Sequence, residues 1–187
     1  MDKQAGGCIE VICGGMFVGK AEQLIRRVRQ AQIAREKVQV FEPRLDDRYL
    51  VEKVACHNGM HLDASVGEAK EIVQLEDPET TVVAIVEGQS FDWTIGGVCN
   101  LPADNGRRVI IAGPDVDFRR QRFGPMPLLM AEAEKVDRFQ AICVVWGAPG
   151  DRAECLIDSR GCPTTSGDPG RRQRRVRGAL PPMPRGP

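Results

Sequence analysis

The sequence predicts an α/β protein with a mostly parallel sheet and helices on both of its faces. Three observations support this prediction. An apolar run, Cys8 to Cys13, leads into a glycine-rich segment and then into an amphipathic helical pattern. Two more apolar runs, 82–86 and 108–113, recur further along the chain, each separated from the next by a helix-like stretch. Strands that alternate with helices are typical of βαβ units, and strands covered on both faces read as continuous apolar runs.

The glycine-rich segment after the first run has the spacing of a phosphate-binding loop. It contains Gly14, four residues, Gly19 and Lys20, a pattern that wraps backbone N–H groups around a phosphate chain at a helix N-terminus. The alternative is a simple glycine turn between a strand and a helix. In the phosphate-binding interpretation the nucleotide-binding positions are Gly14, Gly15, Met16, Phe17, Val18, Gly19, Lys20 and Ala21.

One position of this loop departs from the pattern. The residue after the lysine normally carries a hydroxyl that binds Mg²⁺, and here it is Ala21. The run 82–86 is followed by Glu87, where open α/β sheets bind ligands, but Val86 stands where an aspartate normally holds Mg²⁺ through water. We therefore expect ATP binding with weak dependence on the metal.

The remaining elements follow in order. A helix is expected over 21–36, with Arg26, Arg27 and Arg29 on its solvated side, and a short strand over 38–41. An Asn-Gly turn lies between His57 and His61, which we interpret as exposed turn residues rather than metal ligands. Further predictions are a helix over 68–75, a weak helix over 92–105, a loop over 115–125, a helix over 127–133 and a last strand over 140–145.

Composition indicates one main domain and a different C-terminal segment. The 187 residues carry 26 basic and 26 acidic side chains, and arginines crowd the C-terminal end. No apolar run reaches the roughly 20 residues that span a bilayer, there is no secretory signal, and the seven cysteines include no CxxC pair, so we expect a cytoplasmic protein with reduced thiols. Residues 159–187 are rich in Gly, Pro, Ser and Arg and are predicted to be a disordered tail without a specific nucleic-acid partner.

Several segments together resemble the cytosolic, bacterial and poxviral type of thymidine kinase. They are GGMFVGKA, IRRVRQAQIAREKVQVFEPRLDDRY, HNGM, VVAIVEGQSF, GRRVIIAGPDVDFRRQRFGPMPLLM and QAICVVWG, and they span about residues 8–158. The resemblance implies a P-loop, RecA-like domain over 1–145, a remnant of a small zinc lobe over 146–158, and transfer of the ATP γ-phosphoryl group to the 5′-hydroxyl of thymidine. It also implies a homo-oligomer, with a tetramer expected.

The resemblance also assigns roles to residues. Glu87 would be the general base, and Val86, Gln89 and Arg119 would join the loop around the ATP phosphates. Ser90 replaces a phenylalanine of the family beside the nucleoside pocket. The positions near the thymine ring are Met16, Phe118, Phe123 and Gly124.

The family's zinc lobe is incomplete in this sequence. Cys143 remains at one ligand position, its partner position holds Trp146, and the second cysteine pair is absent, so we predict that zinc is not bound. Residues 176–187 can be encoded by a DNA string whose neighbouring frame reads YEARCRRCHEV, which resembles the family's lid and second metal pair. A frameshift near Ser159 would explain this tail, and sequencing the encoding DNA tests it.

Three functions stay open at this point. The first is an ATP-dependent thymidine kinase, impaired by the changes at Ala21 and Val86. The second is a nucleotide-binding protein of the same fold without catalysis. The third is another P-loop ATPase.

Overall fold

The structure is a computed structural model that describes residues 6–16, 18–44, 53–55, 61–142, 149–150, 154–155 and 176–177. Its helices are α1 (Lys20–Ile33), α2 (Ala69–Leu75), η1 (Gly88–Ser90, a 3₁₀ turn), α3 (Ile95–Asp104) and α4 (Met126–Glu132). Its strands are β1 (Cys8–Gly14), β2 (Val38–Pro43), β3 (Lys53–Ala55), β4 (His61–Asp63), β5 (Ser65–Gly67), β6 (Val82–Ile85), β7 (Arg108–Gly113), β8 (Lys135–Phe139), β9 (Ala141–Ile142), β10 (Pro149–Gly150), β11 (Glu154–Cys155) and β12 (Val176–Arg177).

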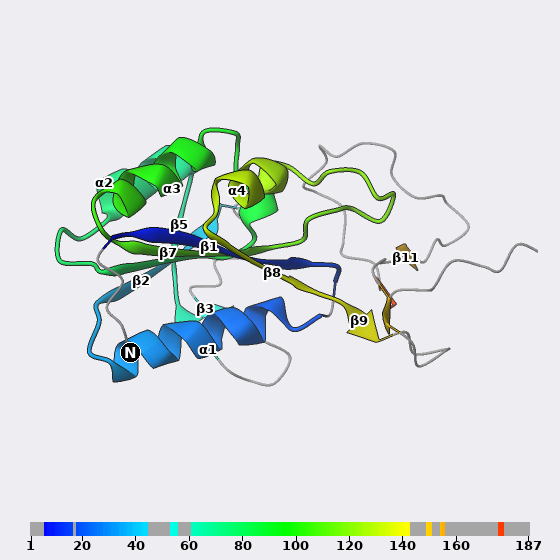
Figure 1. The fold of residues 1–187 in the computed structure, drawn as a ribbon, viewed down its shortest axis with the longest axis horizontal. Helices are drawn as coiled ribbons and strands as arrows, with labels where there is room; N and C mark the ends of the chain where they lie inside the picture. The colour runs from blue at the N-terminus through cyan, green and yellow to red at the C-terminus, as the bar shows by residue number, and fades with distance from the viewer. Residues whose placement is uncertain are drawn as a thin grey trace, which may run out of the picture.

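The centre of the molecule is a six-stranded sheet in the order β5-β2-β6-β7-β1-β8, in which every neighbouring pair is parallel. Helix α1 covers one face, and α2, α3 and α4 cover the other (Figure 1). This three-layer arrangement confirms the predicted α/β fold with helices on both faces. Because the strands are parallel, their carboxyl ends lie at one edge of the sheet, where β1 turns into α1.

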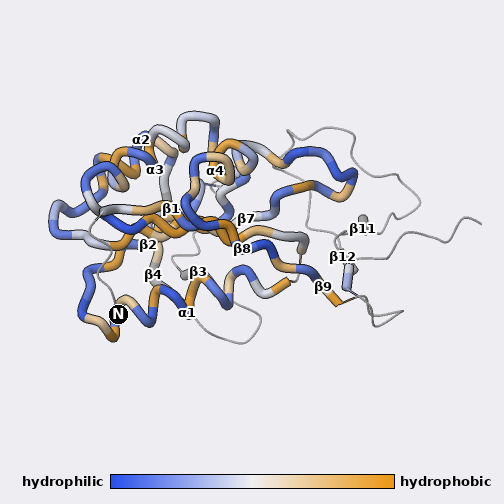
Figure 2. Tube along the Cα trace, viewed as in Figure 1, coloured by the Kyte–Doolittle hydropathy of each residue, from blue (hydrophilic) through white to orange (hydrophobic). Residues whose placement is uncertain are grey.

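Two apolar clusters, one on each face of the sheet, form the core. The cluster on the α1 side includes Ile12, Leu24 and Ile110. The cluster on the opposite side includes Ile9 and Phe41, and all five side chains are fully or nearly fully buried. Figure 2 shows the apolar strands in the middle of the molecule, between helices with mixed surfaces. Alternate residues of each central strand enter opposite clusters, which is why these strands read as continuous apolar runs.

A buried ionic cluster interrupts the apolar layer under α1. Arg27 is 7% exposed, donates to the Glu10 carboxylate at 2.6 Å, and also pairs with Asp137 of β8. Arg108 donates to the other Glu10 oxygen at 2.7 Å. The prediction that the α1 arginines simply face solvent is therefore wrong for Arg27, because Glu10 places a carboxylate inside the interface and requires a cationic partner.

The edges of the sheet differ from the sequence prediction. The outer strand beside β1 is Lys135–Phe139, whereas the predicted last strand, 140–145, contributes only the short β9 within the described residues. Strand β8 was missed because an edge strand is partly solvated and carries charged residues rather than an apolar run. The short strand β5 was also missed.

Other predictions agree or lie outside the described residues. Strands β3 and β4 pair antiparallel on either side of the Asn-Gly sequence, as expected for a hairpin, although His57 and the turn itself lie outside. The tail prediction also lies outside, except that β12 pairs with β11. In the part of the chain that is described, none of the helices has the length and apolar character needed to cross a membrane.

Candidate active site

The predicted phosphate loop leaves β1 at Gly14 and enters α1 at Lys20. Gly14 has a φ of 134°, and a Cβ there would lie 2.2 Å from the Phe139 carbonyl oxygen, so a larger residue would push β8 away. Gly19 has a φ of 82° and caps α1 without a side-chain hydrogen bond. A 14-residue helix whose first amides are not capped by a side chain offers its positive end to an anion.

Lys20 is the charged group of this loop. Its Nζ donates to the Gly15 carbonyl oxygen at 2.5 Å. Burial lowers the pKa of Lys20, and the nearby carboxylates of Glu87 and Asp115 act in the opposite direction. The ammonium therefore bonds to the backbone of the loop and lies within electrostatic range of the carboxylates that follow β6 and β7.

Glu87 follows β6 in a conformation that is unusual for a residue other than glycine. Its φ of 51° is left-handed, and such backbone strain concentrates at functional sites. Its carboxylate accepts a hydrogen bond of 2.5 Å from Gln89 Nε2. The Glu87 side chain is exposed while Gln89 is only 8% exposed, so a buried amide orients a carboxylate that reaches solvent.

Three glycines let the backbone close around Gln89. A Cβ at Gly124, whose φ is 52°, would lie 2.1 Å from the Gln89 carbonyl oxygen. A Cβ at Gly113 would lie 2.8 Å from Gln89 Oε1, and one at Gly88 would lie 2.8 Å from the Ile111 side chain. The predicted pocket residue Gly124 and the predicted phosphate-side residue Gln89 are therefore direct neighbours.

The loop between β7 and α4 carries the other predicted pocket residues. The Arg119 guanidinium lies over the Phe118 ring, 5.0 Å from its centroid, a cation–π arrangement. Phe118 and Met16 are exposed apolar side chains, and Phe123 is half-buried. Exposed apolar groups around a polar edge are typical of a surface that a ligand covers.

The two positions that usually serve Mg²⁺ are apolar. Val86 is 5% exposed and belongs to the cluster under α1, and Ala21 packs against the same cluster. Among the described residues no group of three or more His, Cys, Asp or Glu side chains is arranged to hold a metal ion. Mg²⁺ that arrives on a nucleotide needs only one or two protein carboxylates, because phosphates and water complete its coordination.

Two carboxylates at this edge were not predicted from the sequence. Asp115 is 5% exposed; one oxygen accepts from Arg138 Nε at 2.8 Å, and the other, Oδ1, has no partner within the described structure. Glu42 is the penultimate residue of β2, and burial, followed by the charge of Glu87, raises the pKa of its carboxyl group. The Asp115 oxygen without a partner and the Glu42 carboxylate near Glu87 fit a site that receives a cation together with a nucleotide.

The sequence was compared with models of known protein families. Residues 7–154 match the model of the thymidine kinase family. The chain belongs to the thymidine kinase family. A thymidine kinase of this fold is a phosphotransferase by descent, which agrees with a phosphate loop, a lysine and a carboxylate at one sheet edge.

The predicted thymidine kinase site residues are thus mostly placed. Glu87 and Gln89 are hydrogen-bonded at the carboxyl edge, the Glu87 charge acts on Lys20, and Gly124 packs on the Gln89 backbone. Phe17 and Cys143 lie outside the described residues, as does Trp146. The zinc prediction therefore stays a prediction. A charged residue within the apolar run of β1 was the signal in the sequence that could have revealed the ionic cluster.

Proposed function

We propose that this chain transfers the γ-phosphoryl group of ATP to the 5′-hydroxyl of thymidine, at a rate reduced by its unusual metal positions. The proposal is carried by two groups at the carboxyl edge of the sheet. Lys20 is bonded to the loop backbone at Gly15, and Glu87 is held by Gln89 and acts on the Lys20 charge. The Lys20 ammonium can bind phosphate oxygens, and the Glu87 carboxylate can accept a hydroxyl proton. Family membership supports the choice of thymidine as acceptor.

Binding of the phosphates falls to the loop and to the start of α1. The amides from Gly15 to Lys20 and the helix end bind oxygens without a proton transfer, and Lys20 exchanges its Gly15 carbonyl partner for a phosphate oxygen. Arg119 reaches the same edge from the β7–α4 loop in this proposal. Positioning and charge neutralisation of this kind supply most of the catalysis of phosphoryl transfer.

Glu87 acts as the general base in the proposed reaction. Its carboxylate accepts the 5′-hydroxyl proton as the oxygen attacks phosphorus. Gln89 holds that carboxylate through the 2.5 Å hydrogen bond, while Gly124 packs closely on the Gln89 backbone and Gly113 on its side-chain amide oxygen. The nucleoside base would lie against Met16, Phe118 and Phe123, since flat apolar contacts suit a methylated pyrimidine.

Mg²⁺ bound with ATP would neutralise the charge that develops on the phosphate oxygens. The residues at this edge fit such an ion through carboxylates rather than through the usual pair of positions, since Ala21 and Val86 offer no oxygen side chain.

A second candidate function is nucleotide binding without phosphoryl transfer. The apolar character of Ala21 and Val86 favours it, because both are packed against the apolar cluster under α1. In that case ATP would bind the loop and thymidine would gain no phosphate.

The test is formation of thymidine monophosphate from radiolabelled thymidine and ATP with Mg²⁺ by the purified full chain. We expect slow product formation that Glu87→Gln abolishes while ATP binding remains. Product formation that Glu87→Gln leaves unchanged would refute the role of Glu87. ATP binding with no product at any enzyme concentration would favour the second function.

The expected homotetramer and the expected loss of zinc belong to the same proposal. Light scattering at micromolar concentrations tests the first, and metal analysis of the purified chain tests the second. A monomer at all concentrations, or one zinc ion per chain, would contradict them.

A further inference from the structure

Glu42 lies on the strand next to Val86, the position where an aspartate normally holds Mg²⁺ through water. Strands β2 and β6 are parallel neighbours in a register that pairs Phe41 with Ile85, and the Val86 amide donates to the Phe41 carbonyl oxygen at 3.0 Å. The next residue of each strand therefore lies alongside the other. Glu42 is the cross-strand neighbour of Val86.

The two side chains also share a face of the sheet. Val40 and Val86 belong to the cluster under α1, whereas Phe41 belongs to the cluster on the opposite face. Because side chains alternate along a strand, Glu42 projects to the same face as Val40, which is the face that carries the phosphate loop and α1. Its carboxylate is half-buried there rather than free in solvent.

The surroundings of Glu42 call for a cation. Glu87 is close enough for its negative charge to act on Glu42, and in the described residues no side chain forms an ion pair with Glu42. Asp115 Oδ1, which has no partner among the described residues, is buried at the same edge, and the Asp115 charge acts on Lys20. The Lys20 ammonium thus lies near the Glu87 and Asp115 carboxylates, Arg138 binds one Asp115 oxygen, and within the described residues the other Asp115 oxygen has no partner.

We propose that Glu42 supplies the carboxylate that orders the water shell of nucleotide-bound Mg²⁺, in place of the aspartate that is absent at Val86. Neighbouring strands are about 4.8 Å apart. A glutamate is one methylene longer than an aspartate, so its carboxylate reaches part of the way across the distance between the two strands. A metal-bound water can bridge the remaining distance, since Mg²⁺ keeps several waters when it binds with phosphates.

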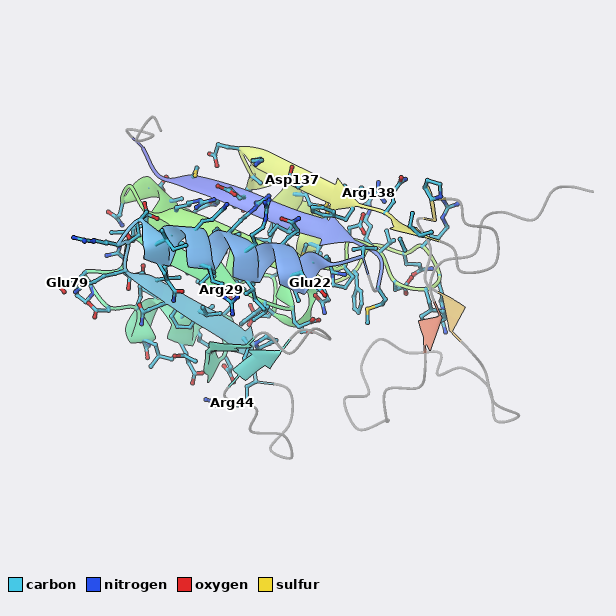
Figure 3. All side chains as sticks on the ribbon, turned by 90° about the horizontal axis from the view of Figure 1, so that it is seen from below. Glu22, Arg29, Arg44, Glu79, Asp137 and Arg138 are labelled. Atoms are coloured by element: carbon cyan, nitrogen blue, oxygen red, sulfur yellow. The ribbon has the colours of Figure 1, made fainter. Side chains whose placement is uncertain are left out.

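The proposal rests on the proposed function only in requiring ATP at the phosphate loop, and its test uses no thymidine. Three variants of the full chain are compared with the wild type. Glu42→Gln removes the charge and keeps the shape, and Glu42→Gln with Val86→Asp returns a carboxylate to the usual strand. Glu79→Gln is the matched control, since Glu79 lies at the opposite end of the sheet from Glu22 and Arg44 (Figure 3).

Two affinities are measured for each protein. Calorimetry with ATP in EDTA gives the affinity of the phosphate loop alone, and electron paramagnetic resonance gives the affinity of Mn²⁺ for the protein–ATP complex. Glu42→Gln should bind metal-free ATP as tightly as the wild type or more tightly, because a negative charge has left the site. Its Mn²⁺ affinity should fall about 10-fold or more, as for other outer-shell metal partners.

Loss of any negative charge near the site would shift the two affinities in opposite directions, so the control and the double variant test whether the effect belongs to the position of Glu42. Glu79→Gln should match the wild type in both measurements, and the double variant should recover Mn²⁺ affinity, which a misfolded protein could not do. Wild-type Mn²⁺ affinity in Glu42→Gln would overturn this inference alone. Absence of ATP binding in EDTA by the wild type would overturn the proposed function as well.

Discussion

Replacing Arg27 with methionine should destabilise the fold by about 3 kcal/mol, the lower end of the range for breaking a buried ion pair. Arg27 is 7% exposed and holds both Glu10 and Asp137. The cost stays at the lower end because Glu10 keeps Arg108 at 2.7 Å and Asp137 keeps Lys135 at 3.4 Å. Urea unfolding followed by circular dichroism measures the change.

The control is Arg26→Met on the exposed side of the same helix, which should change stability by less than about 0.5 kcal/mol. A second comparison is Arg27→Met with Glu10→Leu, which should cost less than the single change because the buried Glu10 carboxylate is removed together with Arg27, and the half-buried Asp137 keeps Lys135. If Arg27→Met unfolds within about 0.5 kcal/mol of the wild type, the ionic cluster does not support the position of α1, and this reasoning is refuted.

The same variant has a defined pH dependence. The hydrogen bond from Arg27 is the main cause that lowers the pKa of Asp137. A lowered carboxyl pKa contributes stability that is present above the unfolded value of about 3.9 and is lost as the pH falls toward the folded value. The difference in unfolding free energy between wild type and Arg27→Met should therefore shrink below about pH 4, and a constant difference would contradict the assignment.

Three further predictions follow from the site. Gly124→Ala should lower the melting temperature and the thymidine phosphorylation rate together, because its Cβ would meet the Gln89 carbonyl oxygen at 2.1 Å; a variant with wild-type values would contradict that packing. Gln89→Leu should lower kcat more than it weakens ATP binding, since the Glu87 carboxylate loses its 2.5 Å hydrogen bond; equal losses would assign Gln89 to the phosphates. Burial raises the pKa of Cys13 to about 11 and that of Cys99 to about 12, so peptide mapping should find both thiols unalkylated at pH 8 until urea is added.

The sequence predicted the parts of the fold whose local pattern agrees with their final environment. Strands β1 and β7 are covered on both faces, so their apolar runs identify them with nearly correct ends. Helix α3 was predicted as weak because of its glycines. The structure gives Gly96 a reason, since a Cβ there would lie 2.9 Å from the Leu128 side chain of α4.

The rest depended on contacts between distant segments. The edge strand β8 has no apolar run, and only its pairing with β1 identifies it. Likewise, Glu10 and Arg27 each look unremarkable until the sheet and α1 bring them to 2.6 Å.

The candidate site shows the same division. The loop spacing identified Gly14, Gly19 and Lys20, and the strand end identified Glu87, because these signals are local in the sequence. Glu42 could not be recognised in this way, since its importance comes only from the register that sets it beside Val86.

The most direct test of the account is the rate of thymidine monophosphate formation by the variant Ala21→Thr with Val86→Asp. The account predicts a gain of about 10²-fold over the wild type, because two electrostatic partners of the transferring phosphate are restored. Adding Glu87→Gln should abolish this activity. A double variant that binds ATP and stays as slow as the wild type, while a chain with a rebuilt Cys-Arg-Arg-Cys-His lid becomes active, would contradict it.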